Sequence, residues 1–175
     1  MDEIKIYDNF LNKLEVKFFE KILNNNKWEF GHMSENNGFD CKFWYMELIN
    51  DETAYKFIKN KIEENLKKKI SIDRLYANGQ TFGLNGSYHK DTSNTSDDNL
   101  FTFCIYINDV PNDTLKHAGG NIQIKIPNKN FSISIEPLNG RGVLFPSNYT
   151  HKGNAFDRFF TGLRICIACK FVILE

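Results

Sequence analysis

Near its C-terminus the chain carries a strictly alternating stretch, Gly162-Leu163-Arg164-Ile165-Cys166-Ile167-Ala168-Cys169. Successive side chains of a β-strand point to opposite faces, so this stretch predicts a strand with one bulky apolar face and one face of small side chains around Arg164. An arginine that points into a barrel is costly unless an anion meets it, and its guanidinium can hold a carboxylate with two hydrogen bonds. A strand-end arginine in solvent is the alternative interpretation. We expect an inner strand with an anion site.

The same period of two extends outward from this stretch, back to about Ile70. It predicts short antiparallel strands over residues 72–78, 82–89, 100–108, 120–126, 131–136, 142–146, 149–153 and 162–173. Strands of this length and spacing are typical of a small sandwich or barrel. Within the strand expected over 100–108, Thr102, Cys104 and Tyr106 share a semi-polar face that lies opposite a face of phenylalanine and isoleucine.

Two helices are expected in the first 70 residues. The first follows a cap at Asp8 or Asn9 and carries an apolar stripe of Phe10, Leu14, Phe18 and Ile22. The second begins near Asp51 and carries a stripe of Ala54, Phe57, Ile58, Ile62 and Leu66. Short strands are expected over 4–7, 28–30 and 43–48. The pattern predicts a mainly β protein, in which the helices of residues 1–70 support one outer face of a core formed by residues 71–175.

Length and charge limit the possible functions. The chain has 175 residues, which suits one domain with a substantial core. Lys+Arg and Asp+Glu balance at 22 each, so no global charge attracts nucleic acid or anionic lipid. The first residues lack a basic segment followed by an apolar one, and no run approaches the roughly 18 apolar residues of a membrane-spanning helix. We expect a cytoplasmic protein with no membrane partner.

The four cysteines are Cys41, Cys104, Cys166 and Cys169. Cys166 and Cys169 are three residues apart in a strand-like stretch, which places them on opposite faces, and no second Cys/His pair has the spacing of a zinc site. Disulfides and a zinc site are therefore disfavoured. We expect reduced, buried thiols.

A short motif further upstream offers a metal site. His89 and Asp91 are two residues apart, so a strand would place both side chains on one face. With His151 they would form a facial triad, which leaves three positions on an iron ion for a chelating cosubstrate and O2. Alone, His-x-Asp is more often a surface turn, and a single histidine a surface hydrogen bonder. The other histidines, His32 and His117, lack partners at metal spacing and are assigned to surface or core packing.

Two tyrosines and a polar loop complete the candidate site. Tyr106 is expected to donate its hydroxyl to the anion that Arg164 holds, and a tyrosine capped by backbone at a barrel end is the alternative. Tyr76 is a second candidate of the same kind. The polar segment 92–99 directly follows the His-x-Asp motif and is a candidate lid or substrate rim.

Together these motifs resemble those of the Fe(II)/2-oxoglutarate-dependent oxygenases, specifically their prolyl 4-hydroxylase-like branch. The resemblance covers residues from about 75 to 173. In chain order its motifs are Tyr76-x-x-Gly79-Gln80, His89-x-Asp91, Thr102-x-x-x-Tyr106-x-Asn108, Gly119-Gly120-Asn121-Ile122-Gln123-Ile124, Ile135-Glu136-Pro137 with Gly142-x-Leu144-Phe145, and His151 followed by Gly162-x-Arg164. Several motifs in a fixed order are far more specific than His-x-Asp alone.

The resemblance implies a double-stranded β-helix, the jelly-roll core that is also found in cupins. It implies that His89, Asp91 and His151 bind Fe(II). It further implies that Arg164 holds the distal carboxylate of 2-oxoglutarate. The implied activity is hydroxylation of an unactivated C–H bond, most simply in a peptide or protein, with oxidative decarboxylation of 2-oxoglutarate to succinate and CO2.

By the same resemblance, Tyr106 assists Arg164 and Tyr76 lines the cosubstrate pocket. O2 is the second cosubstrate and ascorbate an optional reductant. No further catalytic side chain is implied, because the protein contributes orientation and the exclusion of water.

The chain departs from the family pattern at two places. Arg164 lies farther from His151 than is usual, so residues 154–161 look like an insertion that bears on the cosubstrate pocket. Lys170 stands where prolyl hydroxylases often carry a tryptophan near the substrate.

Two other functions stay open. Arg158-x5-Arg164 reproduces the arginine pair of AlkB-like oxygenases, which demethylate nucleic acids, although Arg158 follows His151 closely and the chain is neutral. A β-barrel module that binds an acidic ligand through Arg164 without turnover is an alternative of a different class.

Overall fold

The described residues, 3–25, 27–34, 41–92, 99–108 and 110–174 of a computed structural model, form mainly antiparallel β-strands. In chain order the elements are β1 (Lys5–Tyr7), α1 (Lys13–Leu23), β2 (Glu29–His32), β3 (Phe43–Glu47), α2 (Glu52–Leu66), β4 (Ile70–Gln80), β5 (Leu100–Tyr106), α3 (Asn112–Leu115), β6 (Ile122–Lys125), β7 (Ser132–Ile135), β8 (Gly142–Pro146), β9 (His151–Gly153) and β10 (Arg164–Ile173).

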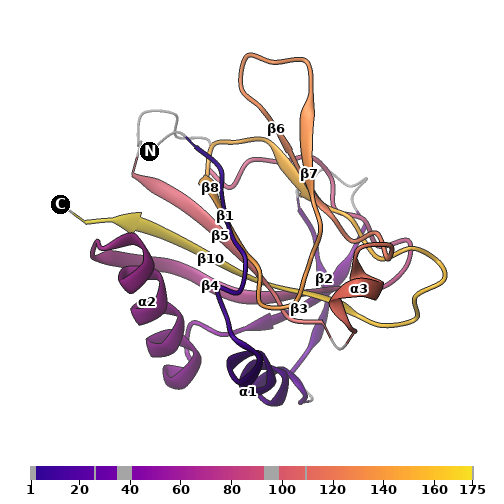
Figure 1. Cartoon of the computed structure of the whole chain (residues 1–175), viewed down its shortest axis with the longest axis horizontal. Coiled ribbons are helices and arrows are strands. Elements are labelled where there is room, and N and C mark those ends of the chain that lie inside the picture. Colours follow the sequence, from indigo (N-terminus) through magenta and orange to yellow (C-terminus); the bar gives the residue numbers. More distant parts are fainter. Residues whose placement is uncertain (1–2, 26, 35–40, 93–98, 109, 175) are drawn as a thin grey trace.

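The strands are arranged in two sheets (Figure 1). Within the described ranges, the larger sheet has seven strands in the order β1-β8-β5-β10-β4-β3-β2, and the smaller has three in the order β7-β6-β9. Helices α1 and α2 cover the side of the larger sheet that faces away from the smaller one (Figure 1). The predicted mainly β architecture, a jelly-roll core with two supporting helices, is confirmed.

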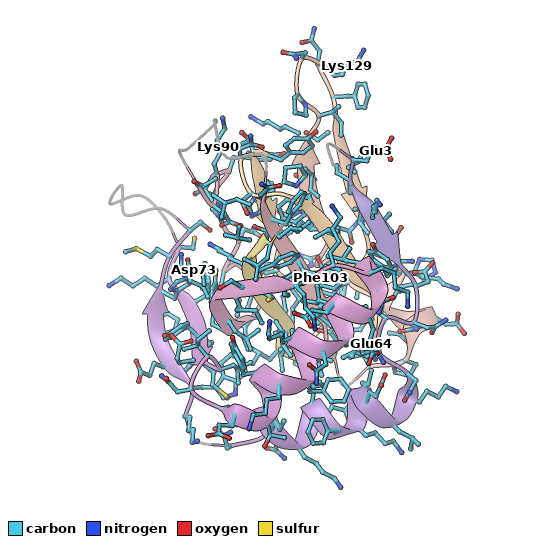
Figure 2. All side chains as sticks on the ribbon, turned by 90° about the vertical axis from the view of Figure 1, so that its left-hand side faces the viewer. Glu3, Glu64, Asp73, Lys90, Phe103 and Lys129 are labelled. Carbon is cyan, nitrogen blue, oxygen red and sulfur yellow. The ribbon has the colours of Figure 1, made fainter. Side chains whose placement is uncertain are left out.

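Alternation along the central strands separates two layers of the core. Phe103 of β5 and Ile167 of β10 pack with the helices in the larger apolar cluster. Cys104 and Cys166, on the opposite face of the same strands, pack with residues of the smaller sheet. Figure 2 shows Phe103 in the interior, far from the tip of the β6–β7 hairpin at Lys129. The faces predicted for strands β5 and β10 are thus confirmed.

Helix α1 begins later than the sequence predicts. Its N-cap is Asn12, whose side-chain oxygen accepts hydrogen bonds from two backbone N–H groups of the first turn. The predicted caps at Asp8 and Asn9 are wrong. The N–H of Leu11 donates instead to the carbonyl of Gly140 at 2.9 Å, and this contact across the fold keeps the preceding residues out of the helix.

The later start also changes the buried face of α1. Val16, Phe19 and Leu23 face the core, whereas Leu14 is 78% exposed. Of the predicted stripe, only Leu14 is wrong: Phe10 is buried just before the helix, and Phe18 and Ile22 are partly buried against the core. Helix α2, by contrast, begins after its predicted cap and buries its predicted stripe. No helix in the described part of the chain is both long and apolar enough to span a membrane.

The strand predicted over 82–89 is not formed. The chain turns after β4, Gly83 adopts a left-handed φ of 85°, and pairing resumes only at an isolated bridge between His89 and His151. The side chain of Gln80 donates to the carbonyl of Leu84 at 2.7 Å, which holds the turn. The segment does run beside β9, where the N–H of Gly86 donates to the carbonyl of Gly153 and His89 pairs with His151, but these contacts do not make it a continuous strand. Residues 93–98 of the candidate lid lie outside the described residues.

All four cysteines are free. Cys104, Cys166 and Cys169 are buried as predicted, and Cys166 and Cys169 belong to different apolar clusters. Cys41 is exposed, so the prediction of a buried thiol is wrong there. It precedes β3 and lies outside both sheets, which explains its exposure.

Candidate metal and cosubstrate site

The backbones of His89 and His151 are directly paired. The N–H of His89 donates to the carbonyl of His151 at 3.0 Å, and the N–H of His151 donates to the carbonyl of His89 at 2.9 Å. Residues paired in this way lie opposite each other, with their side chains on one face. The imidazole centroids are accordingly 4.4 Å apart. One bridge thus brings together two histidines that are distant in sequence.

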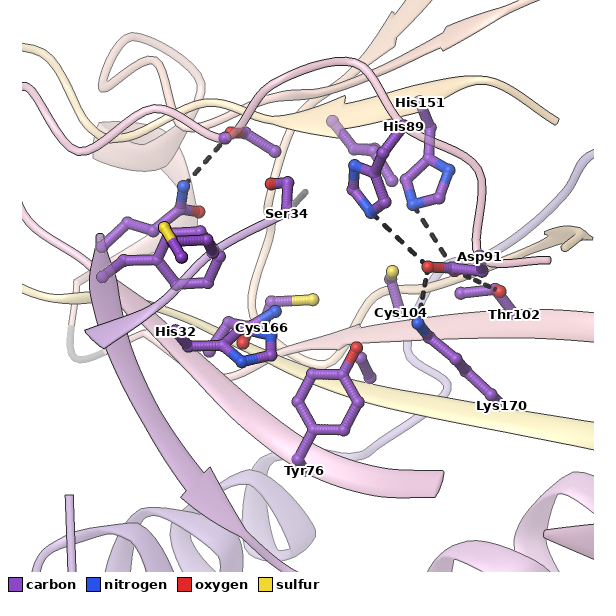
Figure 3. A pocket seen from close by; sticks show the side chains of 18 of the residues that line it. His32, Ser34, Tyr76, His89, Asp91, Thr102, Cys104, His151, Cys166 and Lys170 are labelled. Carbon is purple, nitrogen blue, oxygen red and sulfur yellow. Dashed lines mark hydrogen bonds and ion pairs between the residues drawn. The ribbon is translucent and has the colours of Figure 1, made fainter. Parts of the chain in front are cut away.

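Each imidazole is oriented by the same kind of contact. Nδ1 of His89 lies 2.9 Å from the carbonyl oxygen of Ser87, and Nδ1 of His151 lies 3.0 Å from that of Tyr149. Because a carbonyl oxygen can only accept, each Nδ1 carries the proton and each Nε2 keeps its lone pair. Both Nε2 atoms face Asp91 (Figure 3). A ring fixed through its second nitrogen is well prepared to bind a metal ion.

Asp91 completes a cluster of possible metal ligands. Its Oδ1 lies 3.5 Å from Nε2 of His89, and its Oδ2 lies 3.5 Å from Nε2 of His151. One ligand atom from each of the three residues lies within 4.8 Å of the others. The sequence-predicted residues His89, Asp91 and His151 are therefore brought together, in an arrangement that could hold a metal ion.

Three neighbours hold the Asp91 carboxylate and its backbone. Thr102 Oγ1 donates to Oδ2 at 2.6 Å, and Lys170 Nζ lies 2.6 Å from Oδ1. The N–H of Asp91 donates to the carbonyl of Ser147 at 2.9 Å. Burial by itself would raise the pKa of Asp91, but the two imidazoles and the Lys170 ammonium outweigh it and hold the pKa well below its usual range. The carboxylate is therefore charged at neutral pH.

The two histidines differ in their proton affinity. Burial lowers the pKa of His151 to about 4, so this imidazole is neutral at pH 7. Burial also acts to lower the pKa of His89, but hydrogen bonds to Asp91 and to the Ser87 carbonyl outweigh it and raise the pKa. Neutral imidazoles are the form that binds a metal ion, so a cation entering the cluster would displace any proton held by His89.

Arg164 lies at the other end of the inner face of β10. Its Nε donates to the carbonyl of Gly120 at 2.7 Å, and its Nη1 donates to Gln80 Oε1 at 2.9 Å. A Cβ on Gly153 would lie 3.3 Å from Nη1 and 3.5 Å from Nη2, so this glycine leaves open space beside the guanidinium. In the described ranges no acidic side chain pairs with Arg164. Its outer edge could therefore bind an anion, and that role stays a prediction.

Residues 154–161 shape the surroundings of Arg164 indirectly. Phe156 is buried against α3, and a Cβ on Gly120 would lie only 2.7 Å from its ring. Gly120 adopts a left-handed φ of 74°, and its N–H donates to the carbonyl of Ala155 at 3.0 Å. Because the carbonyl of Gly120 accepts the Nε–H of Arg164, the segment that looks like an insertion in the sequence fixes one partner of the guanidinium.

The two predicted tyrosines occupy different positions. Tyr106 is fully buried beside Arg164, whose Cζ lies 5.2 Å from the ring centroid. Its hydroxyl has no hydrogen-bond partner in the described part of the structure. An unpaired buried hydroxyl is costly, so a bound anion or water would satisfy it. Tyr76 lines the cavity nearer the triad, with its ring centroid 5.7 Å from Lys170 Nζ.

The triad and Arg164 line one cavity of about 150 Å³, and the short side chains of Cys166 and Ala168 line it too. Its lining includes residues that sequence reasoning missed. His32, which the sequence assigns to packing, lies in this lining, and burial together with Arg74 and Lys170 lowers its pKa. The edge strand β2 carries it there, and no local pattern signals such a long-range position.

Three further lining residues can be placed from strand alternation. Lys170 alternates with Arg164 along β10, so it faces the same cavity. Asn78 and Gln80 alternate with Tyr76 along β4, and Gln80 is directly opposite Arg164. The side-chain oxygen of Asn78 is buried and has no partner among the described residues. Strand alternation places all three on the face of the cavity: Lys170 with Arg164, and Asn78 and Gln80 with Tyr76.

The family model of the 2OG-Fe(II) oxygenase superfamily matches residues 75–170 of the chain. The chain belongs to this superfamily. Membership in the 2OG-Fe(II) oxygenase superfamily implies an oxidoreductase that uses Fe(II), 2-oxoglutarate and O2. No curated protein matches the chain significantly.

Several solved structures share the fold of this 2OG-Fe(II) oxygenase. A prolyl hydroxylase from Trichoplax adhaerens, in complex with an oxygen degradation domain peptide fragment of hypoxia inducible factor, is 18% identical with a TM-score of 0.71, covering 98% of this chain and 84% of that one. A viral collagen prolyl hydroxylase from Paramecium Bursaria Chlorella virus-1, in a 2OG complex, is 15% identical with a TM-score of 0.68, covering 98% and 96%.

A non-haem alpha-ketoglutarate-dependent epimerase from nogalamycin biosynthesis is 10% identical with a TM-score of 0.69, covering 98% of this chain and 78% of that one. At such identities the likeness shows the fold alone. The fold is shared by prolyl hydroxylases and by oxygenases with other reactions, so the substrate must be argued from the site.

Proposed function

We propose that the protein is an Fe(II)- and 2-oxoglutarate-dependent dioxygenase that hydroxylates a C–H bond of a peptide or protein, with a prolyl residue as the target. The observation that carries this proposal is one cavity with a His-Asp-His cluster near one end and the unpaired edge of Arg164 at the other. A cosubstrate with a carboxylate at each end suits such a cavity.

The chemistry of the donor set suits Fe(II). His89, Asp91 and His151 would supply two neutral imidazoles and one carboxylate, which leaves three positions for the cosubstrate and O2. Bound Fe(II) and 2-oxoglutarate supply the activation of O2 and the oxidising power of the reaction. The chain itself contributes orientation: Thr102 holds the Asp91 carboxylate toward the imidazoles.

The chemistry at the other end suits 2-oxoglutarate. Arg164 would bind the distal carboxylate through its free edge, and Gly153 leaves the space for it. Tyr106, whose hydroxyl lacks a partner, would donate to the same carboxylate. Tyr76 would line the pocket closer to the metal ligands. Burial of these groups would exclude water from the reacting atoms.

A peptide substrate is supported by the prolyl hydroxylase from Trichoplax adhaerens, whose structure contains a peptide fragment. We also propose that residues 1–175 act as one domain, because helices α1 and α2 share an apolar cluster with strands β4, β5 and β10. Ascorbate would serve as an optional reductant. The cytoplasmic location stays a prediction.

The first test is anaerobic addition of Fe(II) and 2-oxoglutarate, followed by visible absorption spectroscopy. We expect the weak charge-transfer band of such sites in the wild type and its loss in His89→Ala. Arg164→Ala should weaken 2-oxoglutarate binding at least tenfold, about 1.4 kcal/mol, while metal affinity changes little. A missing band in the wild type, or a band that survives in His89→Ala, would contradict the iron assignment. Equal loss of both affinities would make Arg164 a structural residue.

The second test addresses the substrate. Proline-containing peptides are incubated with the loaded enzyme, and mass spectrometry records the gain of one oxygen atom. Turnover of 2-oxoglutarate without any oxygen on proline would reject the prolyl target and keep the oxygenase.

The structure gives no support to the AlkB-like alternative. Arg158 is exposed, and its guanidinium lies over the ring of Phe159 at 5.0 Å, outside the lining of the cavity. The arginine pair that Arg158 and Arg164 form in sequence is therefore not formed in space. Methylated oligonucleotides assayed beside the peptides test this directly. A module that only binds a carboxylate would show no charge-transfer band.

A further inference from the structure

Two cations face each other across the β4–β10 pair at the end of the cavity away from Arg164. Lys170 of β10 is directly opposite Arg74 of β4, and both side chains line the cavity. The ring of Tyr76 contacts both, with its centroid 5.7 Å from Lys170 Nζ and 5.1 Å from Arg74 Cζ. Like charges directly opposite in a sheet are destabilising. A pair that breaks this rule indicates a functional role.

The cavity has few negative charges to balance these cations. Among the described residues that line the cavity, Asp91 is the one acidic residue. The basic residues in the lining are Arg74, Lys90, Arg164 and Lys170. Lys170 is only 9% exposed, and its ion pair with Asp91 at 2.6 Å is its one salt bridge within the described ranges. Arg74 forms no ion pair with any described residue.

Loading the site would leave it with excess positive charge. If Asp91 binds a divalent metal and 2-oxoglutarate binds at Arg164, three carboxylates would face the metal ion, Arg164 and Lys170, which together carry four positive charges. Lys170 would share Asp91 with the metal, and a buried cation whose charge is only partly balanced is costly. Because Lys170 lies further along the same face of β10 than Arg164, 2-oxoglutarate bound to Arg164 would not supply the missing charge.

We propose that Lys170 and Arg74 bind a carboxylate of the substrate, so the substrate of this oxygenase is acidic close to the carbon that is hydroxylated. This inference rests on the proposed function and names the substrate class of the same site. The carboxylate belongs either to an acidic residue of a peptide or to a free amino acid. A carboxylate fits better than a nucleic-acid phosphate, because Lys170 is buried beside the triad and the chain has no net charge to attract a polyanion.

The competing role for Lys170 is that of a positioning residue that only orients Asp91. The two roles predict different results when the charge is removed. A residue that only positions Asp91 would abolish metal binding in Lys170→Met and leave any preference for acidic ligands unexplained. A substrate-binding residue would remove the preference for acidic ligands while the charge-transfer band persists.

The experiment uses the full chain, loaded anaerobically with Fe(II) and 2-oxoglutarate so that no turnover occurs, and measures binding by calorimetry. The probes are two matched pairs. One is a capped pentapeptide with glutamate on both sides of a central proline and its glutamine counterpart, and the other is free L-proline and L-prolinamide. The variants are Lys170→Met, Lys170→Arg and Arg74→Met. Lys125→Met, an exposed lysine of β6 outside the cavity, is the control.

We expect the acidic member of one pair to bind the wild type at least tenfold more tightly than its neutral partner. This preference should vanish in Lys170→Met, decrease in Arg74→Met, and persist in Lys170→Arg and Lys125→Met. The pair that shows it identifies the source of the carboxylate.

Three results would overturn the inference while the charge-transfer band of the wild type shows that the oxygenase site is intact. The first is that neither pair shows a preference for its acidic member. The second is that the preference survives in Lys170→Met. The third is that a methylated single-stranded oligonucleotide binds tightly instead. Loss of the band in Lys170→Met would assign Lys170 to positioning Asp91 and also overturn it. A missing band in the wild type would reject the proposed function itself.

Discussion

At the scale of single residues, the proposed cosubstrate pocket depends on a residue without a side chain. Gly153 lies beside both Arg164 and Gln80, and a Cβ there would be 3.2 Å from Gln80 Oε1 and 3.3 Å from Arg164 Nη1. Such a methyl group would occupy the space that a carboxylate needs beside the guanidinium. We expect Gly153→Ala to weaken 2-oxoglutarate binding roughly tenfold, about 1.4 kcal/mol, as measured by titration of the charge-transfer band.

Gly162→Ala is the matched control for this prediction, because nothing lies within 4 Å of a Cβ at Gly162. It should bind 2-oxoglutarate like the wild type. Unchanged binding in Gly153→Ala would show that the anion approaches Arg164 from another side.

The sequence predicts the metal cluster because its signals are local or ordered. His89 and Asp91 share a face through their spacing, and His151 follows in the order of the motifs. The ion pair between Lys170 and Asp91 could not be predicted, since alternation assigns a side chain to a face and gives no distance across a cavity. His32 could not be placed for a similar reason, because its strand reaches the cavity only through the pairing of β2 with β3.

At the scale of elements, helix α1 shows how a contact outside the helix decides where it begins. The hydrogen bond from Leu11 to Gly140 keeps Phe10 outside the helix, and within it Phe19 is buried while Leu14 is exposed. The segment 82–89 shows the same dependence for strands. Its period of two predicts a strand, but its backbone bonds to β9 are too few to form one. The types of most elements were predictable from local patterns. The start of α1 and the absence of a strand over 82–89 depend on residues distant in the sequence.

A pair of substitutions in α1 tests this burial. Phe19→Ala removes a fully buried ring and is expected to lower the free energy of unfolding by roughly 3–5 kcal/mol. Leu14→Ala, at a position that is 78% exposed, should change it by less than about 0.5 kcal/mol. Urea unfolding followed by circular dichroism measures both. Similar losses at the two positions would mean that Leu14 is buried as the sequence predicts.

At the scale of the whole molecule, the carboxylate of Glu63 links helix α2 to the start of strand β4. Glu63 accepts hydrogen bonds from Lys59 at 2.8 Å, Lys69 at 2.7 Å and the N–H of Ile70 at 3.1 Å. These donors lower the pKa of Glu63 from 4.5 to about 2. A lowered carboxyl pKa stabilises the fold above about pH 4.5, and this contribution is lost as the pH falls toward 2.

We therefore expect Glu63→Gln to be less stable than the wild type at pH 7, by less than about 1 kcal/mol because the ion pairs are screened by solvent. The difference should shrink as the pH falls from 4.5 to 2. Urea unfolding across this range measures it, with the exposed neighbour Glu64→Gln as the control. A difference that stays constant with pH would show that the carboxylate charge is not the cause.

The bridge between His89 and His151 also bears on the order in which the molecule folds. Its two hydrogen bonds close a long loop of chain, and such closure costs entropy that only later contacts recover. Helices α1 and α2 and the pairing of β2 with β3 need no such closure. We therefore expect the three proposed metal ligands to meet only after the smaller sheet has docked. A chain interrupted before β9 would lose His151 together with the central strand β10, so it would lack both the cluster and much of the core that holds the helices.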